Sequence, residues 1–114
     1  MHELGIVVHV MRMVEEVAEE NQLTEIKSVT CEIGEVSGVV PEYLTDCWGY
    51  ARKKSGLLKD SELRTEIIPG VTVCEDCGKT YSTVQYAKIC PYCGSSATYL
   101  LEGNGFSINE IEGA

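Results

Sequence analysis

Cys74-Glu-Asp-Cys77-Gly78 and Cys90-Pro-Tyr-Cys93-Gly94 are the two stretches that decide how this chain folds. Two residues between cysteines let one tight turn direct both sulfurs toward the same ion, and the following glycine relieves crowding of the backbone. The residues between the motifs, 78–89, are enough for a short hairpin that joins the turns. Two facing turns place four sulfurs at tetrahedral corners, so the spacing predicts a structural zinc site.

Other interpretations of the cysteines stay open. The second motif is also similar to rubredoxin-like iron sites, although this segment offers a thinner aromatic core than those proteins have. A nucleic-acid-binding zinc ribbon is disfavoured because the bases Lys79 and Lys88 are balanced by Glu75 and Asp76, which leaves no basic stripe. Two disulfides are disfavoured because the chain is expected to be cytoplasmic, where thiols stay reduced.

Charge and hydropathy limit the partners of the chain. Its 114 residues include 18 acidic and 9 basic side chains, for a net charge of −9. This charge disfavours nucleic acids and anionic membranes, and favours a basic protein partner or a cationic cargo. No apolar run approaches the roughly 18 residues of a membrane span. The start, Met1-His2-Glu3, lacks the basic region of a signal peptide, so we expect a cytoplasmic protein.

Hydrophobic periodicity predicts two helices. The first covers residues 4–20, and its expected apolar stripe comprises Leu4, Val7, Val8, Met11, Val14 and Ala18, widened by Val10 and Val17. Asn21 is the expected stop. The second helix begins at Pro41, which suits a first helical turn, and ends near Arg52-Lys53-Lys54. Its expected buried stripe comprises Leu44, Cys47, Trp48 and Ala51.

Alternating apolar residues predict three strands, at 26–33, 63–67 and from Phe106. In the first strand Val29, Cys31 and Ile33 share one face, and Ser28, Thr30 and Glu32 share the other. A strand–helix–strand order should give a parallel pair with a right-handed crossover, and the last strand should rejoin that sheet.

The predicted fold class is therefore α+β. It has a small mixed three-stranded sheet with two helices, in the order α-β-α-β with a final β, and an inserted zinc-ribbon-like domain with four cysteines. The expected boundaries are residues 1–69 plus 103–114 for the α/β domain and residues 70–102 for the insertion. We expect Val73, Tyr81, Val84, Tyr86, Ile89 and Tyr99 to cover the metal.

The N-terminus is a second candidate metal site. The amine of Met1 and the amide and imidazole nitrogens of His2 form adjoining chelate rings that favour a square-planar ion such as nickel(II) or copper(II), and Glu3 can add an oxygen. The alternative is a solvated terminus in which Glu3 favours the start of the helix. His9 is interpreted as an ordinary residue, and Cys31 and Cys47 as unpaired core thiols.

With His2-Glu3 at its start and CxxCG and CPxCG motifs near its end, the whole chain resembles the HypA/HybF family of hydrogenase nickel-incorporation proteins. The stretch Ile33-Gly34-Glu35-Val36-Ser37 and the closing Gly103-Asn104 agree with this resemblance. The resemblance implies a nickel metallochaperone with a nickel-binding α/β domain and a zinc domain. It implies Ni(II) as cargo at Met1, His2 and Glu3, and structural zinc at Cys74, Cys77, Cys90 and Cys93.

The resemblance also implies partners and a client. These are a hydrogenase maturation GTPase and the large-subunit precursor of nickel–iron hydrogenase, with urease as a further client and a homodimer as a further assembly. Some family members have a carboxylate in the loop that follows the Gly-Glu-x-Ser stretch. Here that loop reads Gly38-Val39-Val40-Pro41, so Glu42 is the nearest acid, and we do not assign it as a ligand.

The favoured function is a carrier and not an enzyme. The sequence has no nucleophile–base constellation, no glycine-rich phosphate loop after a strand and no open-site zinc motif. The alternative is a zinc-ribbon protein-interaction adaptor without nickel transfer, and a small iron-containing redox protein is the third hypothesis.

Overall fold

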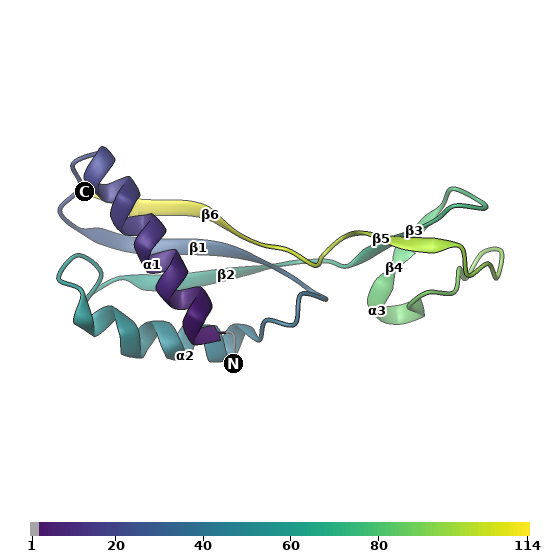
Figure 1. The fold of residues 1–114 in the computed structure, drawn as a ribbon, viewed down its shortest axis with the longest axis horizontal. Helices are drawn as coiled ribbons and strands as arrows, with labels where there is room; N and C mark the ends of the chain where they lie inside the picture. Colours follow the sequence, from purple (N-terminus) through teal and green to yellow (C-terminus); the bar gives the residue numbers. More distant parts are fainter. Residues whose placement is uncertain (1–2) are drawn as a thin grey trace. The chain divides into compact units, whose positions relative to one another are not determined.

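A computed structural model describes residues 3–114 of the chain. The elements are α1 (Glu3–Glu20), β1 (Ile26–Gly34), α2 (Pro41–Ala51), the 3-10 helix η1 (Arg52–Lys54), β2 (Glu62–Ile68), β3 (Val71–Cys74), β4 (Thr80–Ser82), α3 (Thr83–Tyr86), β5 (Thr98–Glu102) and β6 (Phe106–Gly113) (Figure 1). Within these described residues no helix is long and apolar enough to cross a membrane.

The chain divides into two compact units. Unit 1 comprises the described part of Met1–Glu32, together with Val39–Glu66 and Ser107–Ala114. Unit 2 comprises Ile33–Gly38 and Ile67–Phe106. It therefore includes both cysteine motifs and also a short segment from the first half of the chain.

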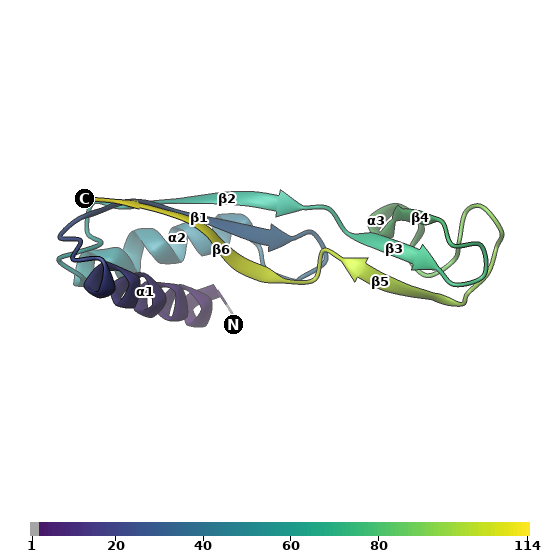
Figure 2. The ribbon, with the colours of Figure 1, turned by 90° about the horizontal axis from the view of Figure 1, so that it is seen from above.

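The sheet of unit 1 has the strand order β2-β1-β6, with helices α1 and α2 on one side of it (Figure 2). The arrows of β1 and β2 point the same way in Figure 2, as expected for a β-α-β connection. The hydroxyl of Ser28 on β1 donates to Glu112 on β6, and the hydroxyl of Ser107 on β6 donates to Glu32 on β1. Residue numbers along β6 therefore fall as those along β1 rise, so β6 is antiparallel to β1. The predicted mixed three-stranded sheet with two helices is confirmed.

Helix α1 buries a narrower face than its sequence predicts. The buried side chains are Val7, Val10, Val14 and Ala18, at spacings of three and four residues. Leu4 and Val8, which were expected in the same stripe, are 45% and 41% exposed. They line a shallow groove of about 340 Å³ with Met11 and with Tyr50 from α2. The stripe was too wide for one contact surface, and α2 covers only part of it.

Local chemistry ends α1 and begins α2 as predicted. The side chain of Asn21 donates to the carbonyl of Val17 at 2.8 Å, and Gln22 turns the chain away with a φ of 58°. Pro41 occupies the first turn of α2, where a missing N–H removes no helical bond. Trp48, 2% exposed, donates its indole N–H to the hydroxyl of Ser61 at 3.1 Å, so its polar atom is satisfied in the core.

The face of β1 that carries its polar residues is buried, as its apolar face is. Ser28 is 2% exposed and Thr30 is 8% exposed. Because β1 is the central strand, side chains from both neighbours reach over it: Asn109 of β6 donates to Glu66 of β2 at 2.9 Å. A polar residue on a central strand can therefore be buried without facing the apolar core.

Unit 2 contains a second sheet with the order β4-β3-β5, antiparallel in both pairings. The segment between the two cysteine motifs is not the predicted hairpin. It forms β4, which pairs back onto β3 with Thr72 opposite Tyr81, and then the single turn α3. The first cysteine turn is itself the bend of the hairpin, since the N–H of Cys74 bonds the carbonyl of Lys79 at 3.0 Å.

Three glycines let three backbone segments of unit 2 approach closely. A Cβ on Gly34 would lie 2.1 Å from the carbonyl oxygen of Gly103, and a Cβ on Gly103 would lie 2.4 Å from the Cα of Gly70. The Val36 N–H bonds the carbonyl of Gly103 at 2.8 Å, and the carboxylate of Glu35 accepts the N–H of Gly70 at 2.9 Å. The 33–37 stretch therefore serves to hold residues 68–70 and 103–105 together.

The two cysteines outside the motifs differ in burial. Cys31 is fully buried on β1, and burial raises the pKa of its thiol to about 11. Cys47 on α2 is only half-buried, so the prediction of a core position holds for Cys31 and only in part for Cys47. Neither forms a disulfide.

We predict that Gly103→Ala lowers the free energy of unfolding by about 2 kcal/mol or more, because Gly103 has a φ of 104° and the new methyl group would overlap the backbone of Gly70. Chemical denaturation measures the change. Gly105→Ala is the matched control, since nothing lies within 4 Å of a Cβ there. Equal stability of the two variants would contradict the close-packing role of Gly103.

We also predict that Cys31 resists alkylation in the folded, zinc-loaded protein. The thiolate is the nucleophile, and a pKa raised to about 11 leaves about one thiol in a thousand ionised at pH 8. Cys47 should react first, and Cys31 only in denaturant. Iodoacetamide treatment followed by peptide mass spectrometry distinguishes them, and equal labelling under native conditions would count against a buried neutral Cys31.

Candidate metal centre

The two cysteine motifs form matching turns. The N–H of Gly78 bonds the carbonyl of Cys74 at 2.8 Å, and the N–H of Gly94 bonds the carbonyl of Cys90 at 2.9 Å. Both glycines have a positive φ, of 75° and 77°, which explains why each motif ends in this residue. The two turns are therefore the same local structure used twice.

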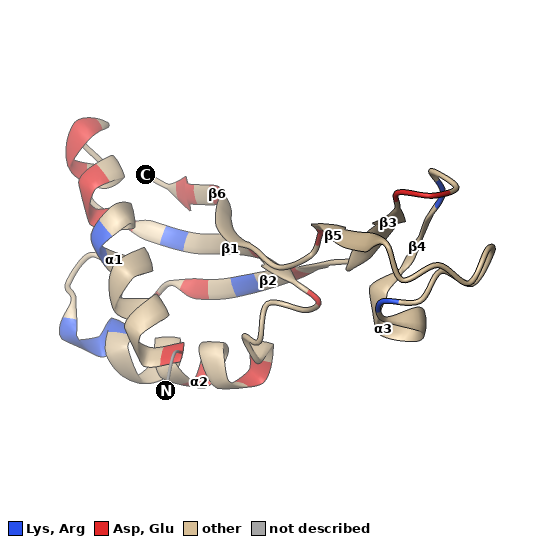
Figure 3. Ribbon diagram, turned by 45° about the vertical axis from the view of Figure 1, so that its right-hand side comes forward, with Lys and Arg blue, Asp and Glu red and all other residues tan. Residues whose placement is uncertain are grey.

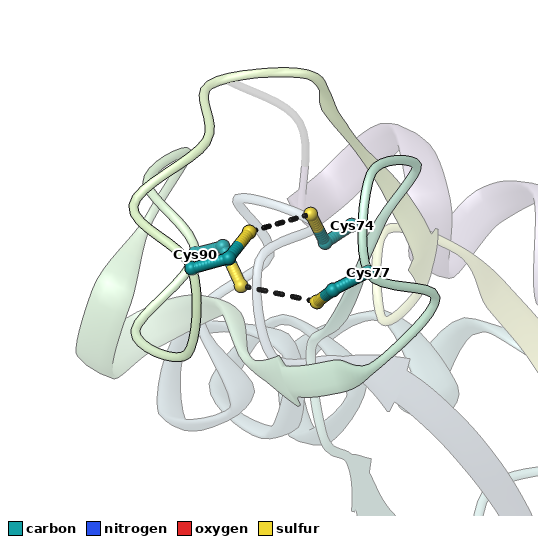
Figure 4. Close-up of side chains that lie close together, drawn as sticks. Cys74, Cys77 and Cys90 are labelled. Atoms are coloured by element: carbon teal, nitrogen blue, oxygen red, sulfur yellow. Dashed lines mark hydrogen bonds between the residues drawn. The ribbon is translucent and has the colours of Figure 1, made fainter.

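The turns bring together the four sulfurs that the sequence predicts as ligands. Cys74 and Cys93 have their Sγ atoms 3.6 Å apart, Cys77 and Cys90 have theirs 3.7 Å apart, and all four atoms lie within 4.8 Å of one another (Figure 4). A tetrahedral ion with bonds of about 2.3 Å to sulfur requires separations of about 3.8 Å. All four thiols are free of disulfides, so the donor set fits zinc.

The protonation of the thiols also fits a bound cation. Burial raises the pKa of Cys90, but the backbone N–H groups of Cys93 and Tyr92 stabilise its thiolate and lower the pKa to about 7. The N–H of Ser95 favours the thiolate of Cys93, yet its neighbour Cys74 and its burial raise the pKa to about 12. Neighbouring thiolates repel one another, so full ionisation of the four sulfurs is favoured when a bound cation neutralises their charge.

Residues beside the cysteines connect the two turns, and sequence reasoning did not assign them this role. The hydroxyl of Ser95 donates to the carboxylate of Asp76, and the N–H of Glu75 bonds the carbonyl of Ala97 at 2.8 Å. The ammonium of Lys79 lies 4.8 Å from the centre of the Tyr92 ring. The sequence indicates these contacts only through the position of the residues, which lie within or next to the motifs.

The predicted apolar cover of the metal is mostly absent. Of the six residues expected there, only Tyr81 is buried, at 6% exposed. Val84, Tyr86, Ile89 and Tyr99 are each more than two-fifths exposed, at 62%, 43%, 53% and 51%. The buried cluster of this part of the chain consists of Cys74, Tyr81 and Cys90, so the ligands themselves form most of it.

The predicted nickel residues lie at the other end of the chain. Met1 and His2 are outside the described residues. Glu3 is the first residue of α1, and its carboxylate accepts the N–H of Val40 at 3.3 Å. The loop before α2 therefore supplies an N–H group to Glu3. His9 is exposed on α1.

The comparisons with known proteins cover the whole chain. The sequence profile described as "Hydrogenase/urease nickel incorporation, metallochaperone, hypA" matches residues 1–113. The chain is 34% identical to the hydrogenase maturation factor HypA of Rhizobium leguminosarum bv. viciae over 98% of each chain. It is 33% identical to that of Moorella thermoacetica over 99% of each.

A solved structure has the same fold. The solution structure of the Ni metallochaperone HypA from Helicobacter pylori matches with a TM-score of 0.73 and 25% identity, over 99% of this chain and 97% of that chain. A small α+β protein with a cluster of four cysteines and this likeness falls in the class of metallochaperones. The chain belongs to the HypA family of hydrogenase and urease nickel-incorporation proteins.

Membership in this family makes the chain a hydrogenase maturation factor, and this role implies contact with the maturation machinery. The family resemblance inferred from the sequence is thereby confirmed.

We predict that Cys74→Ser in full-length protein lowers zinc content well below one ion per chain and selectively loosens unit 2. The variant removes a thiolate from a closed site whose ligands form most of the local buried cluster. Metal analysis and hydrogen exchange measure both effects. Cys47→Ser is the control, since Cys47 lies outside the cluster. Retained zinc with unchanged protection of β3 and β4 would show that the site does not hold the fold.

Proposed function

We propose that this chain carries Ni(II) on its N-terminus and helps deliver it during maturation of nickel–iron hydrogenase, with urease as a further client. The amine of Met1, His2 and Glu3 hold the nickel, and a separate structural zinc is held by Cys74, Cys77, Cys90 and Cys93. The observation that carries the proposal is the match of the family profile to residues 1–113, because that range includes both motifs.

The two sets of ligands suit two different tasks. Four thiolates with no open position hold zinc permanently, whereas a few nitrogen and oxygen ligands on a chain terminus bind an ion that must later leave. The bond from Val40 to Glu3 supports this proposal, since it orients a carboxylate at the start of α1, beside His2 in the sequence.

The proposal extends to domains and activity. Residues 1–69 with 103–114 act as the nickel domain and residues 70–102 as the zinc domain. The protein is a carrier without catalytic activity of its own, and it works in the cytoplasm. All six cysteines, which lie among the described residues, are free thiols, and this supports a reducing compartment.

The proposed protein partners are a maturation GTPase, the hydrogenase large-subunit precursor and a second copy of the chain. Nucleic acids and membranes are not proposed as partners. Acidic residues lie along α1, α2 and the strands, and the bases gather only at the 3-10 helix η1 after α2 (Figure 3). The net charge of −9 would repel phosphate groups.

The exposed apolar side chains of unit 2 favour the alternative, a zinc-ribbon adaptor. Ile89, Tyr92 and Leu101 are each more than half exposed, as is typical of a docking surface. A carrier can also have such a surface, so nickel binding distinguishes the two functions: an adaptor would bind a protein partner but no nickel at its native N-terminus.

We predict that untagged protein binds one Ni(II), and that His2→Ala or a Gly-Ser extension before Met1 weakens binding by roughly a hundredfold, since each change removes or displaces a ligand. Calorimetric titration measures the affinity. His9→Ala is the matched control, because His9 is an exposed histidine on α1. Equal affinity of native and extended protein would refute the proposed ligand set, and no nickel binding by native protein would favour the adaptor.

A further inference from the structure

Helix α1 has a second apolar stripe beside the one that it buries. Leu4, Val8 and Met11 recur at steps of four and three residues, next to the buried residues of the same helix. Leu4 and Val8 are 45% and 41% exposed. The described part of unit 1 therefore leaves much of this second stripe open to solvent, although α1 and α2 pack against each other.

The stripe forms one wall of a groove, and the end of α2 forms the other. Tyr50 of α2 and Lys54 of η1 line the groove, and Tyr50 is 66% exposed. The ammonium of Lys54 lies 5.0 Å from the centre of the Tyr50 ring, so an aromatic surface and a positive charge share this wall. An apolar groove between two helices is the kind of surface into which an amphipathic helix inserts its apolar side chains.

The bases of the chain are concentrated beside this groove. Four of its nine basic residues fall within residues 52–59, and Figure 3 shows the concentration at η1. Arg12 lines the groove from α1. Neither Arg12 nor Lys54 forms an ion pair with another residue of 3–114. Of the described residues that line the groove, only Glu15 is acidic.

Local charge outweighs the net charge of the chain at this place. The net charge of −9 by itself favours a basic partner. Charges more than about 8 Å apart are largely screened at physiological ionic strength, however, so a bound segment interacts mainly with the charges that border the groove. Arg12 and Lys54 outnumber Glu15 there, and the neighbouring Lys53 adds a further positive charge. The groove therefore favours acidic side chains.

We infer that this groove binds an amphipathic helix of another protein, one with apolar residues at positions i, i+4 and i+7 and carboxylates beside them. The apolar residues contact Val8, Met11 and the ring of Tyr50, and the carboxylates pair with Arg12 and Lys54. A basic helix of the same shape would place its charges against these two bases. The inference does not depend on nickel, because none of these residues holds metal in the proposed function.

Two synthetic helical peptides of about 20 residues test the inference, since isolated helices much shorter than this are marginal in water. Both have leucines at i, i+4 and i+7, and one has glutamates where the other has lysines. Each is titrated into untagged, isotope-labelled, zinc-loaded and nickel-free full-length protein. We expect the glutamate peptide to shift the backbone amide signals of residues 4–15 and 50–54, and to bind at least roughly tenfold more tightly than the lysine peptide. Added salt should reduce the difference.

A pair of variants on α1 tests the apolar contact. Val8→Glu should weaken binding of the glutamate peptide at least roughly tenfold, because a carboxylate would then face the apolar side chains and the carboxylates of the peptide. Met13→Glu is the matched control, since Met13 is also 41% exposed on α1 but does not line the groove. Zinc content and circular dichroism check that both variants stay folded.

A charge reversal tests the selection. Arg12→Glu combined with Lys54→Glu should make the groove prefer the lysine peptide, because the bordering charges change sign. Lys27→Glu combined with Lys88→Glu changes the net charge equally at exposed lysines outside the groove, and should keep the preference for the glutamate peptide.

Four results would overturn the inference. These are no binding of the glutamate peptide, equal binding of the two peptides, equal loss in Val8→Glu and Met13→Glu, and signal shifts confined to unit 2. Sedimentation of the free protein adds a further check, since a groove that is filled by a second copy of the chain would also overturn it. Because every titration uses nickel-free protein, a negative result leaves the proposed nickel site to its own test.

Discussion

The convergence of four sulfurs is the constraint on which unit 2 depends. Cys74 and Cys90 are buried, and Tyr81 is the one apolar side chain that joins them in a cluster. An apolar core this small cannot offset the conformational entropy lost on folding. The metal bonds must therefore supply much of the stability of this unit. A closed four-thiolate site can do so because it connects two cysteine pairs that have 12 residues between them along the chain.

Backbone groups around the sulfurs favour the thiolate form, which is the form that binds a cation. Backbone N–H groups point at Cys77, Cys90 and Cys93, and these bonds favour thiolates, while the closeness of the sulfurs opposes full ionisation. A bound dication would offset the repulsion between the sulfurs. At the N-terminus the arrangement is different, since a carboxylate at the start of α1 accepts one backbone N–H from the loop before α2. In the proposed function, the first site holds its metal permanently and the second releases it.

Much of the fold could be predicted because it follows from short-range patterns. Asn21 ends α1 through its own bond to Val17, and Pro41 begins α2, both as local chemistry requires. Which faces of the helices and strands are buried was less predictable. Leu4 and Val8 are exposed because α2 covers only part of the apolar stripe, and Ser28 and Thr30 are buried because β1 lies between two neighbours that reach over it. The pairing of β4 with β3 was missed because the first cysteine turn acts as the hairpin bend.

The sequence by itself determined the four-cysteine motif and the family of this protein. Ligand type and spacing act over a few residues, so Cys74, Cys77, Cys90 and Cys93 could be assigned from their spacing alone, as could the glycines that follow each pair. Only the tertiary structure decided that Gly34 and Gly103 allow backbones to touch, that Glu35 holds the N–H of Gly70, and that apolar residues of α1 and α2 line one groove. These features depend on contacts between segments that are far apart along the chain, and no local pattern encodes which segments will meet.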